Sequence, residues 1–245
     1  MTRSGAQLFA RYAYPPNELG YCGPDDASVL LGRGIEAEAQ IELHARQFEG
    51  AWSYLELIAA AAHIDDPLDP RVVEAYWLGN ELLELIDDAA TPQLLRERLP
   101  PQSGAMWGRG LAHHGYHVFA VYPWTRLLFG ANGNAHAAAT ALRVLDQCRI
   151  RWGTVTALDG DRAIVRCRPL AWHDATLVLG EPAAQSAAIV VDGRSLLAGE
   201  TAPAVGDDVA MHWDWVCDVL QHDQLAALER CTEDQLARVN AMALG

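Results

Sequence analysis

The spacing of apolar residues changes near residue 148, and this change limits the folds open to the chain. Before it, apolar side chains recur at helical spacing, as in residues 51–62, where they form one stripe. After it, apolar and polar residues alternate with the period of two that is typical of a half-buried strand. We therefore expect an α+β protein, with a mostly helical domain over residues 1–146 and a β domain over residues 147–245.

The first half of the chain is predicted to be a bundle of helices joined by turns. Asp69 and Pro70 give the clearest helix start, because aspartate caps helices and proline is favoured at the first helical position. Prolines and glycines in residues 1–24 predict an ordered loop there, since proline disrupts a helix interior. Helices are expected at residues 25–31, 35–48, 51–62, 70–78, 81–86, 91–99 and 135–147.

The second half is predicted to be built from short strands. In the first of these, Cys148, Ile150 and Trp152 fall on one face, and Arg149 and Arg151 fall on the other. Several short strands separated by turn signals and closed by a helix favour a small β-barrel of about 70 residues. Further strands are expected at residues 162–168, 176–179, 187–191 and 209–215, with a helix at residues 224–242.

The charge of the chain excludes several classes of function. Its net charge is −14, and all 18 basic residues are arginine. The absence of lysine excludes a P-loop lysine, a Schiff-base lysine and a lysine general base. An acidic chain without a basic run is poorly suited to nucleic acid, because neutralisation of phosphates supplies most of such affinity. We expect neither a nucleic acid nor an anionic membrane surface as partner.

The sequence predicts a cytoplasmic protein with free thiols. No apolar run reaches the roughly 18–20 residues that a membrane span needs, and no signal peptide is visible at the first residues. The cysteines are odd in number and contain no Cys-x-x-Cys pair, so free thiols are favoured over a disulfide framework. They are Cys22, Cys148, Cys167, Cys217 and Cys231.

A first group of candidate site residues lies in the helical half. His113 and His117 are one turn apart on a helix, His114 lies between them, and neutral imidazoles at this spacing can share a transition metal. The alternative is that these histidines line a domain interface and bond to the backbone. Cys22 lies in a Gly-Tyr-Cys-Gly turn. It is either a structural turn residue or an exposed thiol at a binding cleft.

A second group lies in the predicted barrel, where two elements resemble the HypC/HupF hydrogenase-maturation chaperones. The first element has the pattern Cys-x-x-x-x-Gly-x-Val, and the second has Val-Gly-Asp-x-Val-x-x-His. The matching residues are Cys148, Gly153 and Val155 in the first element and Val205, Gly206, Asp207, Val209 and His212 in the second. Trp152 stands where that family usually has proline, and Cys148 is internal instead of following the initiator methionine.

The resemblance implies a small OB-like barrel and a role in hydrogenase assembly. In that family a thiolate holds an Fe(CN)₂CO fragment or its precursor, and the chaperone escorts the hydrogenase large subunit. Cys148 would then bind iron transiently and contact the partner, with His212 supporting it. The whole chain also resembles an actinobacterial family of unknown function that we associate with hydrogenase gene clusters, through motifs in residues 12–24 and 117–124.

Three hypotheses follow. The first is a non-enzymatic assembly factor that binds a hydrogenase subunit or another maturation protein, and it predicts an accessible Cys148 near His212 and an exposed apolar groove at the domain junction. The second is a metal-binding protein or metal-dependent enzyme centred on His113 and His117. In it these imidazoles and His114 converge with Cys22, or with a carboxylate such as Glu18 or Asp25, in one pocket. The third is a plain scaffold in which Cys148 is fully buried and the histidines are scattered. The partner, the metal and the oligomeric state are left open by the sequence.

Overall fold

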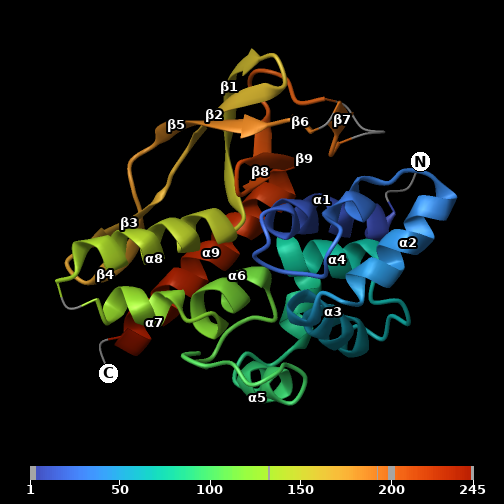
Figure 1. Ribbon diagram of the computed structural model, residues 1–245. Coiled ribbons are helices and arrows are strands. Elements are labelled where there is room, and N and C mark those ends of the chain that lie inside the picture. The colour runs from blue at the N-terminus through green and yellow to red at the C-terminus, as the bar shows by residue number, and fades with distance from the viewer. Residues whose placement is uncertain (1–3, 132, 192, 198–201, 244–245) are drawn as a thin grey trace.

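The computed structural model describes residues 4–131, 133–191, 193–197 and 202–243 as a mixed α+β protein (Figure 1). Helices fill the first part of the chain, a β-sheet region follows, and a long helix ends it. This confirms the predicted fold class. The helical elements before the sheet are α1 (Gly5–Glu18), η1 (Ala27–Leu31), α2 (Ile35–Ala45), α3 (Glu49–Ala61), α4 (Pro70–Trp77), η2 (Glu81–Leu85), α5 (Thr91–Arg96), α6 (His114–Tyr116), η3 (His117–Val121), α7 (Trp124–Phe129) and α8 (Ala135–Cys148).

Helix α1 contradicts the loop predicted for residues 1–24. The Ser4 side chain caps its start by accepting a hydrogen bond from the Gln7 backbone N–H. Pro15 and Pro16 lie near the end of the helix, where only a few backbone bonds are lost. A proline in a helix costs about 3 kcal/mol, whereas each large apolar side chain buried on α1 contributes about 1.5–3 kcal/mol. Several such side chains on α1 are fully buried, so burial outweighs the prolines.

The main sheet has the strand order β1-β2-β5-β9-β8, and β8 pairs back with β1, so the pairing closes on itself. All of its pairs are antiparallel except that of β5 with β9. A side chain at Gly153 would lie 2.4 Å from the Arg166 carbonyl oxygen, so only glycine lets β1 and β2 approach here. The strands are β1 (Arg151–Asp159), β2 (Arg162–Cys167), β3 (Leu170–His173), β4 (Thr176–Leu179), β5 (Ala183–Ala188), β6 (Val190–Val191), β7 (Arg194–Ser195), β8 (Asp208–His212) and β9 (Trp215–Val219).

Three strand predictions are wrong in detail. The strand predicted over residues 187–191 is the end of β5 followed, after Ile189, by the two-residue strand β6. Cys148 is the last residue of helix α8, and the first strand begins only at Arg151. The strand predicted over residues 209–215 is divided into β8 and β9 by a turn at Trp213, which has a φ of 50°. The predicted period of two holds best in β2, where Ala163, Val165 and Cys167 are buried on one face.

Arg149 and Arg151 also differ from the prediction that they form a polar face. Both are buried, with only 2% and 1% of their surface exposed. Arg149 pairs with Asp146, and Arg151 donates to the side chain of Gln147 and to the backbone carbonyl of Trp213. These partners lie on α8 and in the turn at Trp213, so contacts within the protein, and not solvent, surround both arginines.

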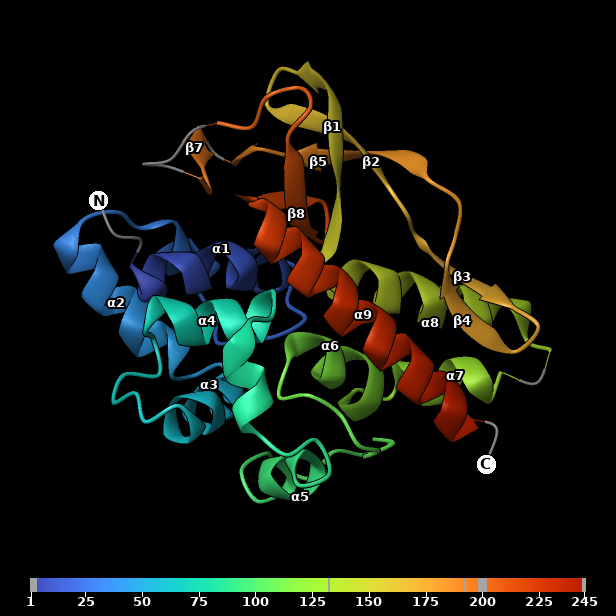
Figure 2. The same cartoon turned by 180° about the vertical axis from the view of Figure 1, so that it is seen from behind.

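The last helix, α9 (His222–Ala243), ties the sheet to the helices. Figure 2 shows it running diagonally across that side of the molecule, from the sheet toward α7. Its apolar spacing predicts a packing stripe of Leu225, Leu228, Leu236 and Val239. The last three are buried, and Leu225 is partly buried against the core. The largest core cluster takes in residues from α1 through β9 and α9, so it crosses the proposed boundary at residue 147. That boundary stays a prediction. Within the described residues, no helix is long and apolar enough to cross a membrane.

Candidate functional site

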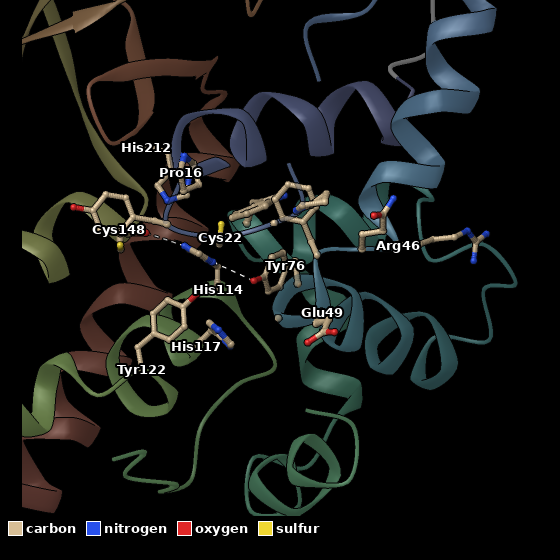
Figure 3. Close-up of a pocket in the computed structure, with 18 residues that line it drawn as sticks. Pro16, Cys22, Arg46, Glu49, Tyr76, His114, His117, Tyr122, Cys148 and His212 are labelled. Atoms are coloured by element: carbon tan, nitrogen blue, oxygen red, sulfur yellow. Dashed lines mark hydrogen bonds between the residues drawn. The ribbon is translucent and has the colours of Figure 1, made fainter. Parts of the chain in front are cut away.

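A pocket of about 660 Å³ lies where the helical half meets the end of α8 and strand β8 (Figure 3). Its walls come from the segment after α1, the start of α3, the end of α4, the α6–η3 region, Cys148 and His212. It therefore brings Cys148 and His212 together with Cys22, His114 and His117, which the sequence placed in two separate candidate sites.

His114 is held in one tautomer by bonds at both ring nitrogens. Its Nε2 lies 2.8 Å from the backbone carbonyl oxygen of Cys148, and its Nδ1 lies 3.1 Å from the hydroxyl of Tyr76. Because a carbonyl can only accept, Nε2 carries the proton, and Nδ1 accepts from the tyrosine. Burial lowers the pKa of His114 to about 4, although the bond to Cys148 opposes this shift. The ring is neutral at pH 7.

His117 begins the single π-helical turn η3, next to α6. Its Nδ1 lies 3.2 Å from the hydroxyl of Tyr54. A side chain at Gly50 would lie 3.1 Å from its Nε2, so the glycine leaves room for the imidazole. Burial, followed by the effect of His114, lowers the pKa of His117 to about 3. This ring too is neutral at pH 7.

His212 is buried, in contrast to the half-exposed position expected for the polar face of a strand. Its Nδ1 donates to the backbone carbonyl oxygen of Tyr12 at 2.6 Å. Its ring packs edge-to-face against His114, with 5.2 Å between the centroids. Burial, followed by the effect of His114, holds the pKa of His212 well below its usual value.

The two pocket cysteines are neutral thiols, and Cys148 is buried, with 7% of its surface exposed, in contrast to the accessible thiol that the first hypothesis predicts. Burial raises the pKa of Cys148 to about 12, and nearby Cys22 adds to the shift. Burial of its sulfur likewise raises the pKa of Cys22 to about 12, although the residue as a whole keeps some exposed surface. The Cys22 carbonyl accepts a hydrogen bond of 2.9 Å from the Asn17 side chain, which holds the segment after α1 in place. Neither thiol is poised as a nucleophile.

His113 lies outside the pocket, in contrast to the predicted cluster of histidines. Its Nδ1 accepts a 2.9 Å hydrogen bond from the Gly115 backbone N–H and caps α6. His113 and His117 are four residues apart, as predicted for one face of a helix, but the His113 ring caps α6. Among the described residues, no group of three or more His, Cys, Asp or Glu side chains has the geometry of a metal site.

One family model matches residues 1–244, almost the whole chain, and its description is "Family of unknown function (DUF6390)". The chain belongs to this family. No curated protein and no solved structure matches the chain. A full-length family of unknown function was expected from the sequence; the resemblance to the hydrogenase-maturation chaperones has no support from these comparisons.

Several residues that shape the site in this DUF6390 protein were missed by the sequence analysis. Tyr54 and Tyr76 were treated as core aromatics, although each bonds to a pocket histidine. Gly50 gave no signal of a site, because it falls between the helices predicted at residues 35–48 and 51–62, where a glycine is typical of a turn. Arg46 and Glu49 are exposed at the mouth of the pocket (Figure 3). Nothing in the sequence pattern distinguishes them from other surface charges.

Proposed function

We propose that this DUF6390 protein is a non-enzymatic accessory protein that binds a small uncharged ligand in the pocket. One observation carries the proposal: cysteines and histidines from distant parts of the chain line a single cavity. Its volume falls within the range of about 300–1,000 Å³ that is typical of small-molecule sites.

The protonation states favour binding over catalysis. A general acid or base works best when its pKa lies near the working pH. The pKa values of His114 and His117 are far below 7, and that of Cys148 is far above it. His114 also uses both ring nitrogens within the protein. These groups suit hydrogen bonding and soft-ligand contacts better than proton transfer.

The interior of the pocket is also unfavourable for a charged group of a ligand. Of its lining residues, Arg46 and Glu49 alone carry a charge at pH 7, and both are exposed at the mouth. A charged group buried deeper would lose its hydration without gaining a counter-ion, which is costly. We therefore expect the buried part of the ligand to be uncharged.

The resemblance to the maturation chaperones makes an Fe(CN)₂CO fragment the first ligand to test. Fe²⁺ and two cyanides carry no net charge together, so the fragment itself is an uncharged ligand, and the one negative charge of the bound complex would come from Cys148. The fragment brings three ligands of its own, so it needs fewer protein donors than a bare ion. Cys148 would supply a thiolate, losing its proton on binding as metal-bound thiols do. His212 would act beside it. The partner protein would be a hydrogenase large subunit or maturation factor.

The strand topology supports the OB-like part of this proposal. Numbered within the closed sheet, the strands run 1-2-3-5-4 and return to 1, with a parallel pair between the third and fifth. A five-stranded Greek-key barrel of this kind is the OB architecture.

The test is affinity purification from the native host without oxygen, followed by measurement of iron and identification of bound proteins. The wild type is compared with Cys148→Ala and with Cys167→Ala, which removes a buried thiol outside the pocket. We expect iron and a hydrogenase subunit or maturation protein with the wild type and the control, and neither with Cys148→Ala. Equal recovery of iron and partner protein from both variants would show that Cys148 is not part of the binding site. If the wild type yields neither iron nor such a partner, the proposed role in hydrogenase assembly is wrong.

A further inference from the structure

Two buried tyrosine–histidine pairs stand side by side at the pocket. Tyr76 bonds to Nδ1 of His114, and Tyr54 bonds to Nδ1 of His117. The two tyrosine rings also contact each other, with 5.3 Å between their centroids. In both pairs the tyrosine hydroxyl bonds to the histidine Nδ1, but the two pairs differ in the partner of the histidine Nε2.

In the first pair, the histidine Nε2 bonds to another group of the protein. Nε2 of His114 donates to the carbonyl of Cys148, and Figure 3 shows this chain from Tyr76 through His114 to Cys148. Nε2 of His117 bonds to no residue in the described part of the chain. His117 as a residue is only 4% exposed, yet its Nε2 is not among the fully buried unpaired atoms of the described residues. The nitrogen therefore keeps some accessible surface, and because His117 lines the pocket, that surface faces the cavity.

The geometry places this nitrogen at the cavity. His117 and Gly50 both line the pocket, and the missing side chain of Gly50 is what gives Nε2 its space. Gly50 is the second residue of α3, and glycine is a poorer helix former than alanine. Its presence there fits a need for space beside Nε2.

The tautomer of His117 follows from Tyr54. The Tyr54 hydroxyl is fully buried, and Nδ1 of His117 is its hydrogen-bond partner among the described residues. A buried hydroxyl without an acceptor would cost about 1–3 kcal/mol. Tyr54 therefore donates to Nδ1, and the neutral imidazole carries its proton on Nε2.

We infer that the Nε2–H of His117 donates a hydrogen bond to the ligand, so that the ligand is an uncharged molecule with a buried hydrogen-bond acceptor. The inference rests on the proposed binding function and adds the polar contact that orients the ligand. A carbonyl oxygen of an organic molecule and a cyanide nitrogen of an iron fragment share this chemistry.

The tautomer can be measured without any ligand. Protein labelled with ¹⁵N at histidine is examined by NMR at pH 7, with His117→Phe used to assign the His117 signals. We expect a protonated Nε2 and an unprotonated Nδ1 for His117. A proton on Nδ1 would overturn the inference while leaving the proposed binding function intact.

The contact is tested with the neutral fluorescent ketone Prodan as an organic probe. Wild type, His117→Phe and the surface control His136→Phe are titrated, and the emission maximum reports hydrogen bonding to the ketone. We expect His117→Phe to bind about tenfold more weakly and with blue-shifted emission, since one lost hydrogen bond corresponds to roughly that factor. Gly50→Ala, whose new methyl group would crowd Nε2, should weaken binding in the same direction.

The outcomes separate the two proposals. Prodan binding that is equal in wild type, His117→Phe and His136→Phe would overturn the role of His117 and keep the pocket. No binding by the wild type would overturn the uncharged-ligand proposal and the inference with it. The iron source is examined by the anoxic purification carried out on His117→Phe: loss of iron identifies a metal-bound acceptor, whereas retained iron with weakened Prodan binding identifies an organic one.

Discussion

The imidazole of His212 replaces a backbone donor that helix α1 lacks at Tyr12. Its Nδ1 lies 2.6 Å from the Tyr12 carbonyl oxygen, although 200 residues separate them in sequence. In a regular helix that carbonyl accepts from the N–H four residues later. The residue there is Pro16, which has no N–H. A strand residue thus completes a hydrogen bond that a proline removed from a helix.

This relationship predicts a coupling between His212 and Pro16. His212→Phe leaves the Tyr12 carbonyl buried without this donor, so we expect the free energy of unfolding to fall by about 1–3 kcal/mol. Pro16→Ala restores a backbone N–H, and the same change in that background should cost less. Urea unfolding of the wild type, both single variants and the double variant measures the coupling. An equal cost in both backgrounds would show that Pro16 is unrelated to the role of His212.

The same relationship explains why α1 was not predicted. Pro15 and Pro16 are local signals against a helix. The residues that precede them in the chain carry no local helix signal strong enough to outweigh the two prolines. The helix forms because its apolar side chains are buried by elements distant in the sequence, and because His212 bonds to the freed carbonyl. Neither contribution can be seen in a window of neighbouring residues. Asp69–Pro70, by contrast, is a purely local signal, and α4 begins where it predicts.

Stability should depend on pH through the buried histidines. Burial lowers the pKa of His113 to about 3, of His114 to about 4 and of His117 to about 3. Below pH 6.5 the unfolded chain binds protons that the folded chain does not, so stability is complete above pH 6.5 and is lost as the pH falls toward 4. At pH 5 each histidine accounts for a loss of about 2 kcal/mol.

Urea unfolding at pH 7.5, 6.5, 5.5 and 5 measures this dependence. His117→Phe removes one of these buried histidines, which also include His212, and should reduce the slope by up to about 1.4 kcal/mol per pH unit. The exposed His136 provides the control, because His136→Phe should leave the slope unchanged. A flat stability profile between pH 7.5 and 5 would show that these rings are protonated at no cost in the folded protein.

Asn17 is predicted to control the reactivity of Cys22. Its side-chain N–H groups donate to the carbonyls of Cys22 at 2.9 Å and Pro24 at 2.7 Å. Asn17→Ala removes both bonds, so the segment should loosen and the Cys22 pKa should fall toward its ordinary value. Alkylation by iodoacetamide at pH 8 should then accelerate, about tenfold for each unit by which the pKa falls.

Mass spectrometry of the alkylated peptides follows Cys22 separately from the other thiols. Asn134→Ala is the matched control, because Asn134 caps α8 on another part of the molecule and should leave the rate unchanged. If Asn17→Ala alkylates no faster than the wild type, other contacts hold the segment. Stacking of Tyr21 on Trp213 would be the first to examine, since their ring centroids are 4.1 Å apart.

The types of residue in the candidate site could be predicted from the sequence, but the way in which the fold brings them together could not. Residue type and spacing identified Cys22, His114 and His117 as candidates, the resemblance to the maturation chaperones added Cys148 and His212, and all five line one pocket. The sequence could not bring them together, because their contacts depend on how the helical half packs against the end of α8. The tyrosines that set the histidine tautomers were hidden for another reason. A buried tyrosine in an apolar stripe has the same pattern whether its hydroxyl bonds to an imidazole or to a backbone carbonyl.

The buried pair of Asp146 and Arg149 gives the largest predicted change in stability. One Asp146 carboxylate oxygen accepts from Arg149 Nε at 3.1 Å and Nη2 at 3.0 Å, and from the Leu170 backbone N–H at 2.9 Å. Asp146→Ala leaves the Arg149 guanidinium, which is 2% exposed, without its counter-ion. We expect a loss of about 3–5 kcal/mol, because an unpaired buried charge is strongly destabilising.

Replacing both charges should be milder than removing one of them. The double variant Asp146→Leu, Arg149→Met removes the charge along with its partner, so its unfolding free energy should lie well above that of Asp146→Ala. Asp159→Ala, at an exposed position in the β1–β2 hairpin, should stay within about 0.5 kcal/mol of the wild type. Urea unfolding compares all of them. A double variant as unstable as Asp146→Ala would mean that Leu170 and the end of α8 depend on the carboxylate itself, as a backbone acceptor and not as a counter-ion.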